Sequence, residues 1–219
     1  MPIVMKQVLV IGGTASIAKK IVEELEINGY SIHLMTFRQK NKIYGNYNWV
    51  ELDLEKQESL KEFISNLPKS FYSKIIINVG NSLGNNYKEI GIEKLDSFFS
   101  TYLSHYLYMI TKLVESLVED GHIVSMSSIA ANRAIPDIYY SAAKAGVQAA
   151  VKSLSSNIGG NKVSYSIAPG LIYDTPAMYH NNYDDYKDQI PYMATKEKIA
   201  EIIIKADISY NGKVIEIGY

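Results

Sequence analysis

Short apolar runs alternate along this chain with longer amphipathic segments, and no other feature of the sequence restricts the fold as strongly. The runs Val8-Leu9-Val10-Ile11 and Ile75-Ile76-Ile77 have no polar face, which is typical of strands buried on both sides of a sheet. The segments between such runs carry apolar residues every three or four positions, which indicates half-buried helices. Two of these sets are Ile17, Ile21, Val22 and Leu25, and Leu107, Ile110, Leu113, Val114 and Leu117.

This alternation predicts an α/β fold in which a doubly wound parallel sheet of about seven strands has helices on both faces, in three layers. No repeat, low-complexity tract or flexible linker interrupts the pattern. A chain of 219 residues that is 47% hydrophobic is long enough for one well-buried domain, so we expect a single domain over residues 1–219. The expected strands are Gln7–Ile11, Ser31–Thr36, Asn48–Leu52, Lys74–Val79, His122–Met126, Lys162–Ile167 and Lys213–Ile217.

Charge and composition exclude several classes of function. The net charge of −1 provides no basic field for nucleic acid or for an anionic membrane surface. The chain has no cysteine, so it has no disulfide, thiol nucleophile or cysteine-bound metal. Its four histidines are scattered and predict no metal site. The apolar N-terminal run is too short to cross a membrane and has no small-residue cleavage site, so we expect a cytoplasmic protein.

The first expected strand runs directly into the segment Gly12-Gly13-Thr14-Ala15-Ser16-Ile17-Ala18 and then into a helix. Glycine permits a tight turn, small residues let backbone amides approach a phosphate, and a helix N-terminus carries positive potential. Ser16 and Ala18 stand where a glycine-rich nucleotide loop usually has its second and third glycines. The segment by itself fits a phosphate site and a plain strand-to-helix turn equally well.

Ser128, Tyr140 and Lys144 form the most specific chemical pattern in the chain. In a helix, Tyr140 and Lys144 share a face, and a nearby ammonium favours the phenolate and so lowers the pKa of the phenol. An apolar run ends in Ser127-Ser128, and a loop containing Pro136 then leads into an alanine-rich helix. This context favours proton transfer over an ordinary exposed pair, although the same spacing recurs at Tyr108/Lys112, Tyr183/Lys187 and Tyr192/Lys196.

The ordered motifs together resemble those of the short-chain dehydrogenase/reductase family, in particular members similar to 3-oxoacyl-acyl-carrier-protein reductases, over nearly the whole chain. The resemblance implies a Rossmann fold, a nicotinamide cofactor and an oxidoreductase that interconverts a carbonyl and an alcohol. The segments that carry it are the degenerate glycine loop Ile11 to Ala18, Asp53-Leu54, Ile77-Asn78-Val79-Gly80, the set Ser128, Tyr140 and Lys144, Ala168-Pro169-Gly170-Leu171-Ile172, and the tail Asn211 to Gly218.

The resemblance also implies roles for the matching residues. Tyr140 would pass a proton to or from the substrate oxygen, and Ser128 would hydrogen-bond that oxygen. Lys144 would hold the nicotinamide ribose and lower the pKa of Tyr140. The cofactor residues that it implies are Gly12, Ser16 and Ile17 at the pyrophosphate, with Thr14 in the same loop; Asp53 and Leu54 at the adenine; Asn78 and Gly80 at the adenosine ribose; and Pro169, Gly170 and Ile172, the last offering backbone groups to the carboxamide.

The choice between NAD and NADP depends on the end of the second strand. A carboxylate there suits the ribose 2′-hydroxyl of NAD, whereas an arginine suits a 2′-phosphate. The segment Met35 to Lys42 has no acid and contains Arg38, so NADP(H) is favoured over NAD(H). The competing interpretation is that Arg38, Lys40 and Lys42 form a solvated basic turn, which we expect to hold for the two lysines.

One expected residue is missing. Family members commonly place a helix asparagine upstream of the catalytic serine, where it completes a proton relay to the lysine. This chain has no asparagine between Asn86 and Asn132. The equivalent place falls near Tyr102, Ser104 and His105, so one of these replaces the asparagine or the relay is absent; His105 otherwise fits a helix residue at a subunit contact.

Substrate choice is expected in the loops at residues 81–88, 129–138 and above all 173–192, the last of which is rich in tyrosine, asparagine and aspartate. Such a loop suits a polar small-molecule substrate, or it is a solvated lid. The leading hypothesis is an NADP(H)-dependent carbonyl reductase that forms a homodimer or homotetramer through the helices at 103–117 and 142–154. The alternatives are a noncatalytic dinucleotide-binding or regulatory protein of the same fold, and an epimerase or dehydratase of the same family.

Overall fold

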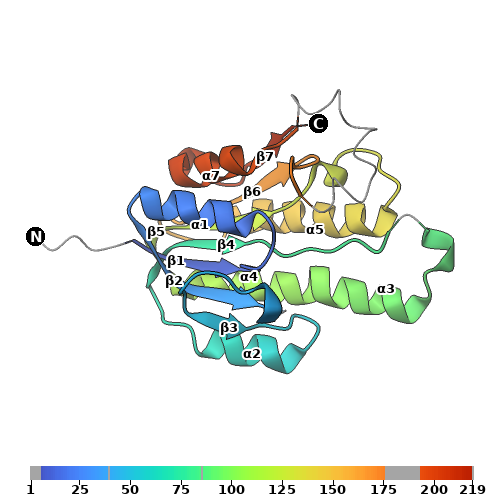
Figure 1. The fold of residues 1–219 in the computed structure, drawn as a ribbon, viewed down its shortest axis with the longest axis horizontal. Coiled ribbons are helices and arrows are strands. Elements are labelled where there is room, and N and C mark those ends of the chain that lie inside the picture. Colours follow the sequence, from blue (N-terminus) through green and yellow to red (C-terminus); the bar gives the residue numbers. More distant parts are fainter. Residues whose placement is uncertain (1–5, 39, 85, 176–192, 219) are drawn as a thin grey trace, which may run out of the picture.

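A computed structural model describes residues 6–38, 40–84, 86–175 and 193–218, and a parallel sheet of seven strands runs through the middle of this part of the chain (Figure 1). The strand order is β3-β2-β1-β4-β5-β6-β7, and every neighbouring pair is parallel. All seven expected strands are confirmed. The strands are β1 Lys6–Ile11, β2 Tyr30–Phe37, β3 Trp49–Glu51, β4 Tyr72–Ile77, β5 Leu117–Met126, β6 Val163–Pro169 and β7 Val214–Ile217.

Helices cover both faces of the sheet, which confirms the doubly wound, three-layer Rossmann architecture. α1 and α7 pack beside each other on one face, and α2, α4 and α5 pack on the other (Figure 1). The order of the strands reverses between β1 and β4, so this is the topological switch point of the sheet. The described helices are α1 Ala18–Ile27, α2 Gln57–Ser65, α3 Ile92–Phe99, α4 Tyr106–Leu113, α5 Ile138–Ser155 and α7 Lys196–Lys205.

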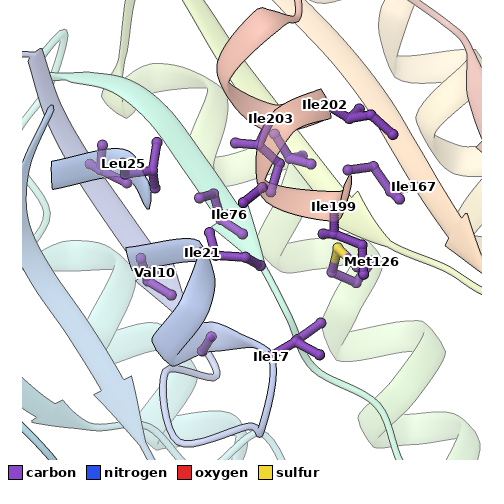
Figure 2. Close-up of a cluster of buried hydrophobic side chains, with 14 of the residues drawn as sticks. Val10, Ile17, Ile21, Leu25, Ile76, Met126, Ile167, Ile199, Ile202 and Ile203 are labelled. Carbon is purple, nitrogen blue, oxygen red and sulfur yellow. The ribbon is translucent and has the colours of Figure 1, made fainter. Parts of the chain in front are cut away.

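The spacing of apolar residues in α1 explains how this helix packs on the sheet. Ile21 and Leu25 lie one turn apart and are completely buried. Figure 2 shows both side chains directed toward Ile76 of β4 and toward the isoleucines of α7. Ile199 and Ile203 are likewise one turn apart and fully buried, so the two helices seal this face of the sheet with matching apolar stripes.

The opposite face holds the helix that carries the expected catalytic residues. Val147 and Val151 of α5 are buried against the sheet together with Met109 and Leu113 of α4. α5 begins at Ile138, where the Asp137 carboxylate accepts a hydrogen bond from the backbone amide of Tyr140, a favourable N-cap. This packing makes α5 a rigid support for the side chains at its first two turns.

The expectation that the helix before β5 includes Leu117 is wrong. α4 ends at Leu113, a 3₁₀ turn covers Val114–Ser116, and β5 already begins at Leu117. The backbone amides of Ser70 and Phe71 donate hydrogen bonds to the carbonyls of Glu115 and Ser116, at 2.9 Å in both cases. These bonds join the chain to the strand beside it before the apolar run at 122–126 begins.

The segment Ser100–His105 between α3 and α4 is a π-helix, so the chain from Ile92 to Leu113 is one long helix with a widened stretch in its middle. Such stretches are rare and are often found at functional sites. Among the helices of the described ranges, none is long and apolar enough to pass through a membrane.

Candidate active site

Two adjoining cavities lie over the carboxyl ends of the strands at the switch point. The smaller has a volume of about 300 Å³ and lies over β1, β2 and β3, and the larger has about 670 Å³ and lies over β4, β5 and β6. Both are lined by Ala15 and by the segment Asn78 to Asn81, so they form one cleft. Ligands bind at this position in open α/β sheets.

The turn between β1 and α1 is built to bring the backbone close to a ligand. Gly12 has φ +80°, and a Cβ at this position would collide with the carbonyl of Asn78, so the turn requires glycine here. The amide of Gly12 donates to Thr36 Oγ1 at 3.0 Å, and the amide of Gly13 donates to the Thr36 carbonyl at 2.9 Å. The turn then enters α1, whose N-terminus favours an anion.

Most of the residues expected to hold a cofactor line this cleft. The exception is Ser16, which is exposed and lines neither of the two cavities. Ile17 lines the larger cavity, but most of its side chain is buried in the core that Figure 2 shows. Those at the smaller cavity are Gly12, Thr14, Arg38, Asp53 and Leu54; those at the larger are Tyr140, Lys144, Pro169, Gly170 and Ile172; Asn78 and Gly80 line both.

Arg38 lies at the wall of the smaller cavity and is half exposed. Its guanidinium pairs with Glu55 at 2.8 Å and, more distantly, with Asp53 at 3.9 Å. Lys42 is exposed, as expected for a solvated turn, but it also lines this cavity, whereas Lys40 is exposed and does not line it. The cavity therefore has two cations beside two carboxylates.

Lys144 is buried in the wall of the larger cavity. Its ammonium donates to the carbonyls of Met126 at 2.8 Å and Val79 at 3.2 Å, and a Cβ at Gly80 would lie 2.8 Å from its Nζ. Burial lowers the pKa of Lys144 to about 8. A side chain at position 80 would therefore push the end of the Lys144 side chain aside.

Tyr140 and Ser128 face each other on the wall of the larger cavity. Burial raises the pKa of Tyr140, a hydrogen bond with Ser128 lowers it, and the Asp137 carboxylate raises it. The expectation that Lys144 lowers the pKa of Tyr140 is not met in this arrangement, because Lys144 Nζ bonds backbone carbonyls and lies 5.6 Å from the centre of the tyrosine ring. Tyr140 is thus a protonated phenol at neutral pH.

Ser128 is positioned by the backbone at the end of β5. Its Oγ accepts a hydrogen bond from the amide of Ala130 at 3.2 Å and donates to the carbonyl of Pro169 at 3.4 Å. Its own carbonyl accepts from Gln148 Nε2 at 3.3 Å. A serine hydroxyl, a phenol and an ammonium are therefore held on one wall of a cleft that is also lined by the glycine turn between β1 and α1.

Comparison with protein families identifies this arrangement. The family model described as short chain dehydrogenase matches residues 6–187 of the chain. The chain belongs to the short-chain dehydrogenase family. A curated relative is the 3-oxoacyl-[acyl-carrier-protein] reductase FabG of Chlamydia pneumoniae, which is 23% identical over 218 residues that cover 91% of this chain and 88% of that protein.

Solved structures of short-chain dehydrogenases have the same fold. A short-chain dehydrogenase/reductase from Brucella melitensis, described as a glucose/ribitol dehydrogenase, has a TM-score of 0.85 at 17% identity and covers 97% of this chain and 94% of its own. BdcA, solved in complex with NADPH, has a TM-score of 0.79 at 18% identity, with coverage of 97% and 92%. At these identities the likeness concerns the fold.

Of the three residues near the place of the missing family asparagine, only Tyr102 reaches the cleft. Ser104 is exposed, and the His105 ring bonds the carbonyl of Leu54 at 2.6 Å within the same chain. Tyr102 lines the smaller cavity, and it also lines a void of about 10 Å³ beside Tyr140 and Lys144. This void is about the size of one water molecule.

The sequence analysis gave no individual role to three polar residues of this short-chain dehydrogenase site, although two of them lie in the loops expected to select the substrate. Thr36 holds the glycine turn, and Ser82 and Asp137 line the larger cavity and hydrogen-bond each other. A sequence signal existed for Asp137, because aspartate three residues before Tyr140, directly after Pro136, fits a helix N-cap. No signal existed for its partner.

Two expectations remain predictions. The polar segment expected to select the substrate, residues 173–192, lies mostly outside the described residues. Of its described residues, Thr175 lines the larger cavity. In the described ranges, no group of three or more histidine, aspartate or glutamate side chains is arranged to hold a metal ion.

Proposed function

We propose that the protein is an NADP(H)-dependent oxidoreductase that interconverts a carbonyl and an alcohol, with Tyr140 as the acid and base. The observation that carries this proposal is that Ser128, Tyr140 and Lys144 line one cavity, joined to a second cavity with a glycine turn and Arg38. These residues fit a nicotinamide dinucleotide, since the glycine turn leads into the N-terminus of α1, which favours a phosphate, and the cations Arg38 and Lys42 line the same cavity as Gly12.

Ser128 and Tyr140 would have different roles in the proposed reaction. The bound nicotinamide supplies or accepts the hydride. Ser128 would hydrogen-bond the substrate oxygen and position it beside Tyr140. Tyr140, whose raised pKa keeps it protonated at neutral pH, would donate its proton to the oxygen as a carbonyl is reduced, and would take the proton back in the opposite direction.

Lys144 would contribute positive charge and position. Its pKa of about 8 leaves the ammonium mostly charged at neutral pH, and its bonds to the Val79 and Met126 carbonyls hold it in the wall of the larger cavity. An ammonium has three N–H groups, so these two bonds leave one donor for a ribose hydroxyl or for Tyr140.

NADP(H) is favoured by the cations at the smaller cavity. Arg38 and Lys42 both line it, and an arginine offers the planar, bidentate donors that suit a phosphate. BdcA, which shares the fold, was solved with NADPH. Glu55 and Asp53 compete for the Arg38 guanidinium, so the preference is expected to be finite rather than absolute.

The first experiment is to titrate the purified protein with NADPH and with NADH, followed by nucleotide fluorescence, and to measure oxidation of each with a panel of ketones, keto-sugars and 3-oxoacyl thioesters. Tyr140→Phe should lower turnover by about 10³-fold or more, because the proton donor is lost, and should leave NADPH affinity within about threefold. The matched control is Tyr108→Phe, since Tyr108 and Lys112 have the same spacing on the exposed side of α4.

The same experiment separates the alternatives. Binding of NADPH without turnover of any carbonyl would favour a noncatalytic dinucleotide-binding protein, which the degenerate loop at Ser16 and Ala18 favours. NADPH that stays bound through purification would favour an epimerase or dehydratase. Unchanged turnover in Tyr140→Phe would remove Tyr140 from the mechanism. A polar small-molecule substrate, a homo-oligomer formed through α4 and α5, and a cytoplasmic location belong to the same proposal.

A further inference from the structure

Asp137 is a buried carboxylate in the wall of the larger cavity, and the division of roles among Ser128, Tyr140 and Lys144 leaves it unexplained. The residue is only 4% exposed. It has no lysine or arginine partner among the described ion pairs. A buried carboxylate without a cation is costly unless hydrogen bonds compensate it, so its partners indicate its role.

The two carboxylate oxygens bind two different parts of the cleft. Oδ1 accepts from the backbone amide of Tyr140 at 3.0 Å, which fixes the first turn of α5. Oδ2 accepts a short hydrogen bond from Ser82 Oγ, and that hydroxyl in turn accepts from the amide of Gly84 at 2.9 Å. Ser82 belongs to the loop after β4, which lines both the dinucleotide side and the substrate side of the cleft through Asn81.

We propose that Asp137 is a positioning residue, whose carboxylate joins the loop after β4 to the first turn of α5 and so holds the Tyr140 hydroxyl toward Ser128 and the substrate. This inference rests on the proposed function, because it assigns Asp137 to the same reaction. It differs from a plain helix cap because a cap requires only one of the two oxygens, whereas here the second oxygen binds a loop 55 positions away in the sequence.

The charge of Asp137 gives this role a signature that a purely structural role would lack. Burial raises the pKa of Tyr140, and the Asp137 carboxylate raises it further. The other titratable groups around Tyr140 are Lys144 on α5, and Tyr102 and Tyr106, which line the small void beside it. Among the described residues, the segments after β4, β5 and β6 contribute no further charged side chain to the wall of the larger cavity.

The test compares Asp137→Asn with Asp137→Ala. Asparagine keeps an oxygen acceptor for the Tyr140 amide but removes the charge, so the pKa of Tyr140 falls. The pH limb of kcat/KM that reports Tyr140 should therefore move to lower pH by about 0.5 to 1 unit, with NADPH affinity unchanged. Alanine removes the acceptor as well, so amide exchange in residues 138–144 should rise by about fivefold and kcat should fall by about tenfold.

Two controls separate position from charge. Asp207→Asn removes a comparable N-cap carboxylate, which accepts from the Ser209 amide at 2.9 Å and lines neither cavity; it should not move the pH limb. Ser82→Ala keeps the Asp137 charge and removes the loop bond, so amide exchange at residues 81–84 should rise while the pH limb stays in place.

Either of two results would overturn the proposal: an unchanged pH limb in Asp137→Asn, or unchanged amide exchange at residues 138–144 in Asp137→Ala. The exchange measurement needs no turnover. If none of the tested carbonyl compounds causes the wild-type protein to oxidise NADPH, the proposed function fails by itself. Amide exchange measured in Asp137→Ala and Ser82→Ala still decides whether the carboxylate joins the loop to α5.

Discussion

At the scale of single residues, Arg38 connects the cofactor proposal to a measurable preference. Its guanidinium is shared between Glu55 and the wall of the smaller cavity, and these exposed ion pairs are worth little, so a 2′-phosphate can replace them. We expect Arg38→Asp to weaken NADPH binding by about tenfold or more, the cost of a lost charge-assisted contact and an added repulsion. NADH binding should stay within about threefold, as measured by parallel fluorescence titrations.

The matched control for Arg38 is Lys40→Asp. Lys40 lies two positions further along the same turn, is exposed, and does not line the cavity, so the same change of charge should alter both affinities equally and slightly. An Arg38→Asp protein with an unaltered ratio of NADPH to NADH affinity would show that Lys42 or another group holds the 2′-phosphate.

The residues of the site differ in how far the sequence could predict them. Tyr140 and Lys144 share a helix face, so their spacing already places them together. Asp137 binds Ser82 across 55 positions, a contact that only the folded chain creates. The direction of the Tyr140 pKa shift could not be predicted from the motif, because it depends on burial, on the hydrogen bond with Ser128 and on the Asp137 carboxylate.

At the scale of elements, the turn between β1 and α1 requires a glycine at position 12. We expect Gly12→Ala to lower the free energy of unfolding by about 2–4 kcal/mol, because alanine at φ +80° is strained and its Cβ would collide with the Asn78 carbonyl. NADPH binding should be lost even where the variant is folded, as checked by urea unfolding and titration.

Gly29→Ala is the control for that variant. Gly29 has nearly the same conformation, φ +79°, but no atom lies within 4 Å of the position of a Cβ, so the variant carries the backbone strain alone, about 1–2 kcal/mol. Equal destabilisation in the two variants, with NADPH binding retained in both, would contradict a role for the close approach of the turn to β4.

The strands and helices with regular apolar spacing were predictable from the sequence, whereas boundaries and helix types that depend on contacts in the folded chain were not. β1 and β4 contain the apolar runs Val8–Ile11 and Ile75–Ile77, which are completely buried, so these runs alone identify the two strands. The start of β5 was not predictable, because residues 114–117 continue a helical spacing. The bonds from the amides of Ser70 and Phe71 to the carbonyls of Glu115 and Ser116, directly before β5, form only in the folded chain. The π-helix at Ser100–His105 likewise has no local signal.

At the scale of the whole molecule, the two ends of the sheet have different chemistry. The carboxyl ends of the strands carry the cleft. Nearer the amino ends, Lys74 of β4 pairs with Val8 of β1 and His122 of β5 in one row across the sheet. Lys74 is 3% exposed, and its ammonium lies 5.5 Å from the ring centre of Tyr30.

The burial of Lys74 makes the stability of the whole fold depend on pH. Burial and, to a smaller extent, the charge of Lys6 lower the pKa of Lys74 from its ordinary value of 10.5 to about 8. The folded state therefore binds fewer protons than the unfolded state between pH 8 and 10.5, so the stability contributed by this residue rises with pH across that window. Below pH 8 the charged amine carries its full desolvation cost.

We therefore expect Lys74→Met to raise the free energy of unfolding by about 1–3 kcal/mol at pH 7, and the gain to shrink as the pH rises toward 10.5, because the wild-type amine loses its charge there. Urea unfolding at pH 7 and pH 9.5 measures both values. The control is Lys6→Met, since Lys6 lies over the same tyrosine ring but is exposed and should change stability by less than about 0.5 kcal/mol. An equal gain at both pH values would mean that packing, and not the buried charge, limits the stability at this end of the sheet.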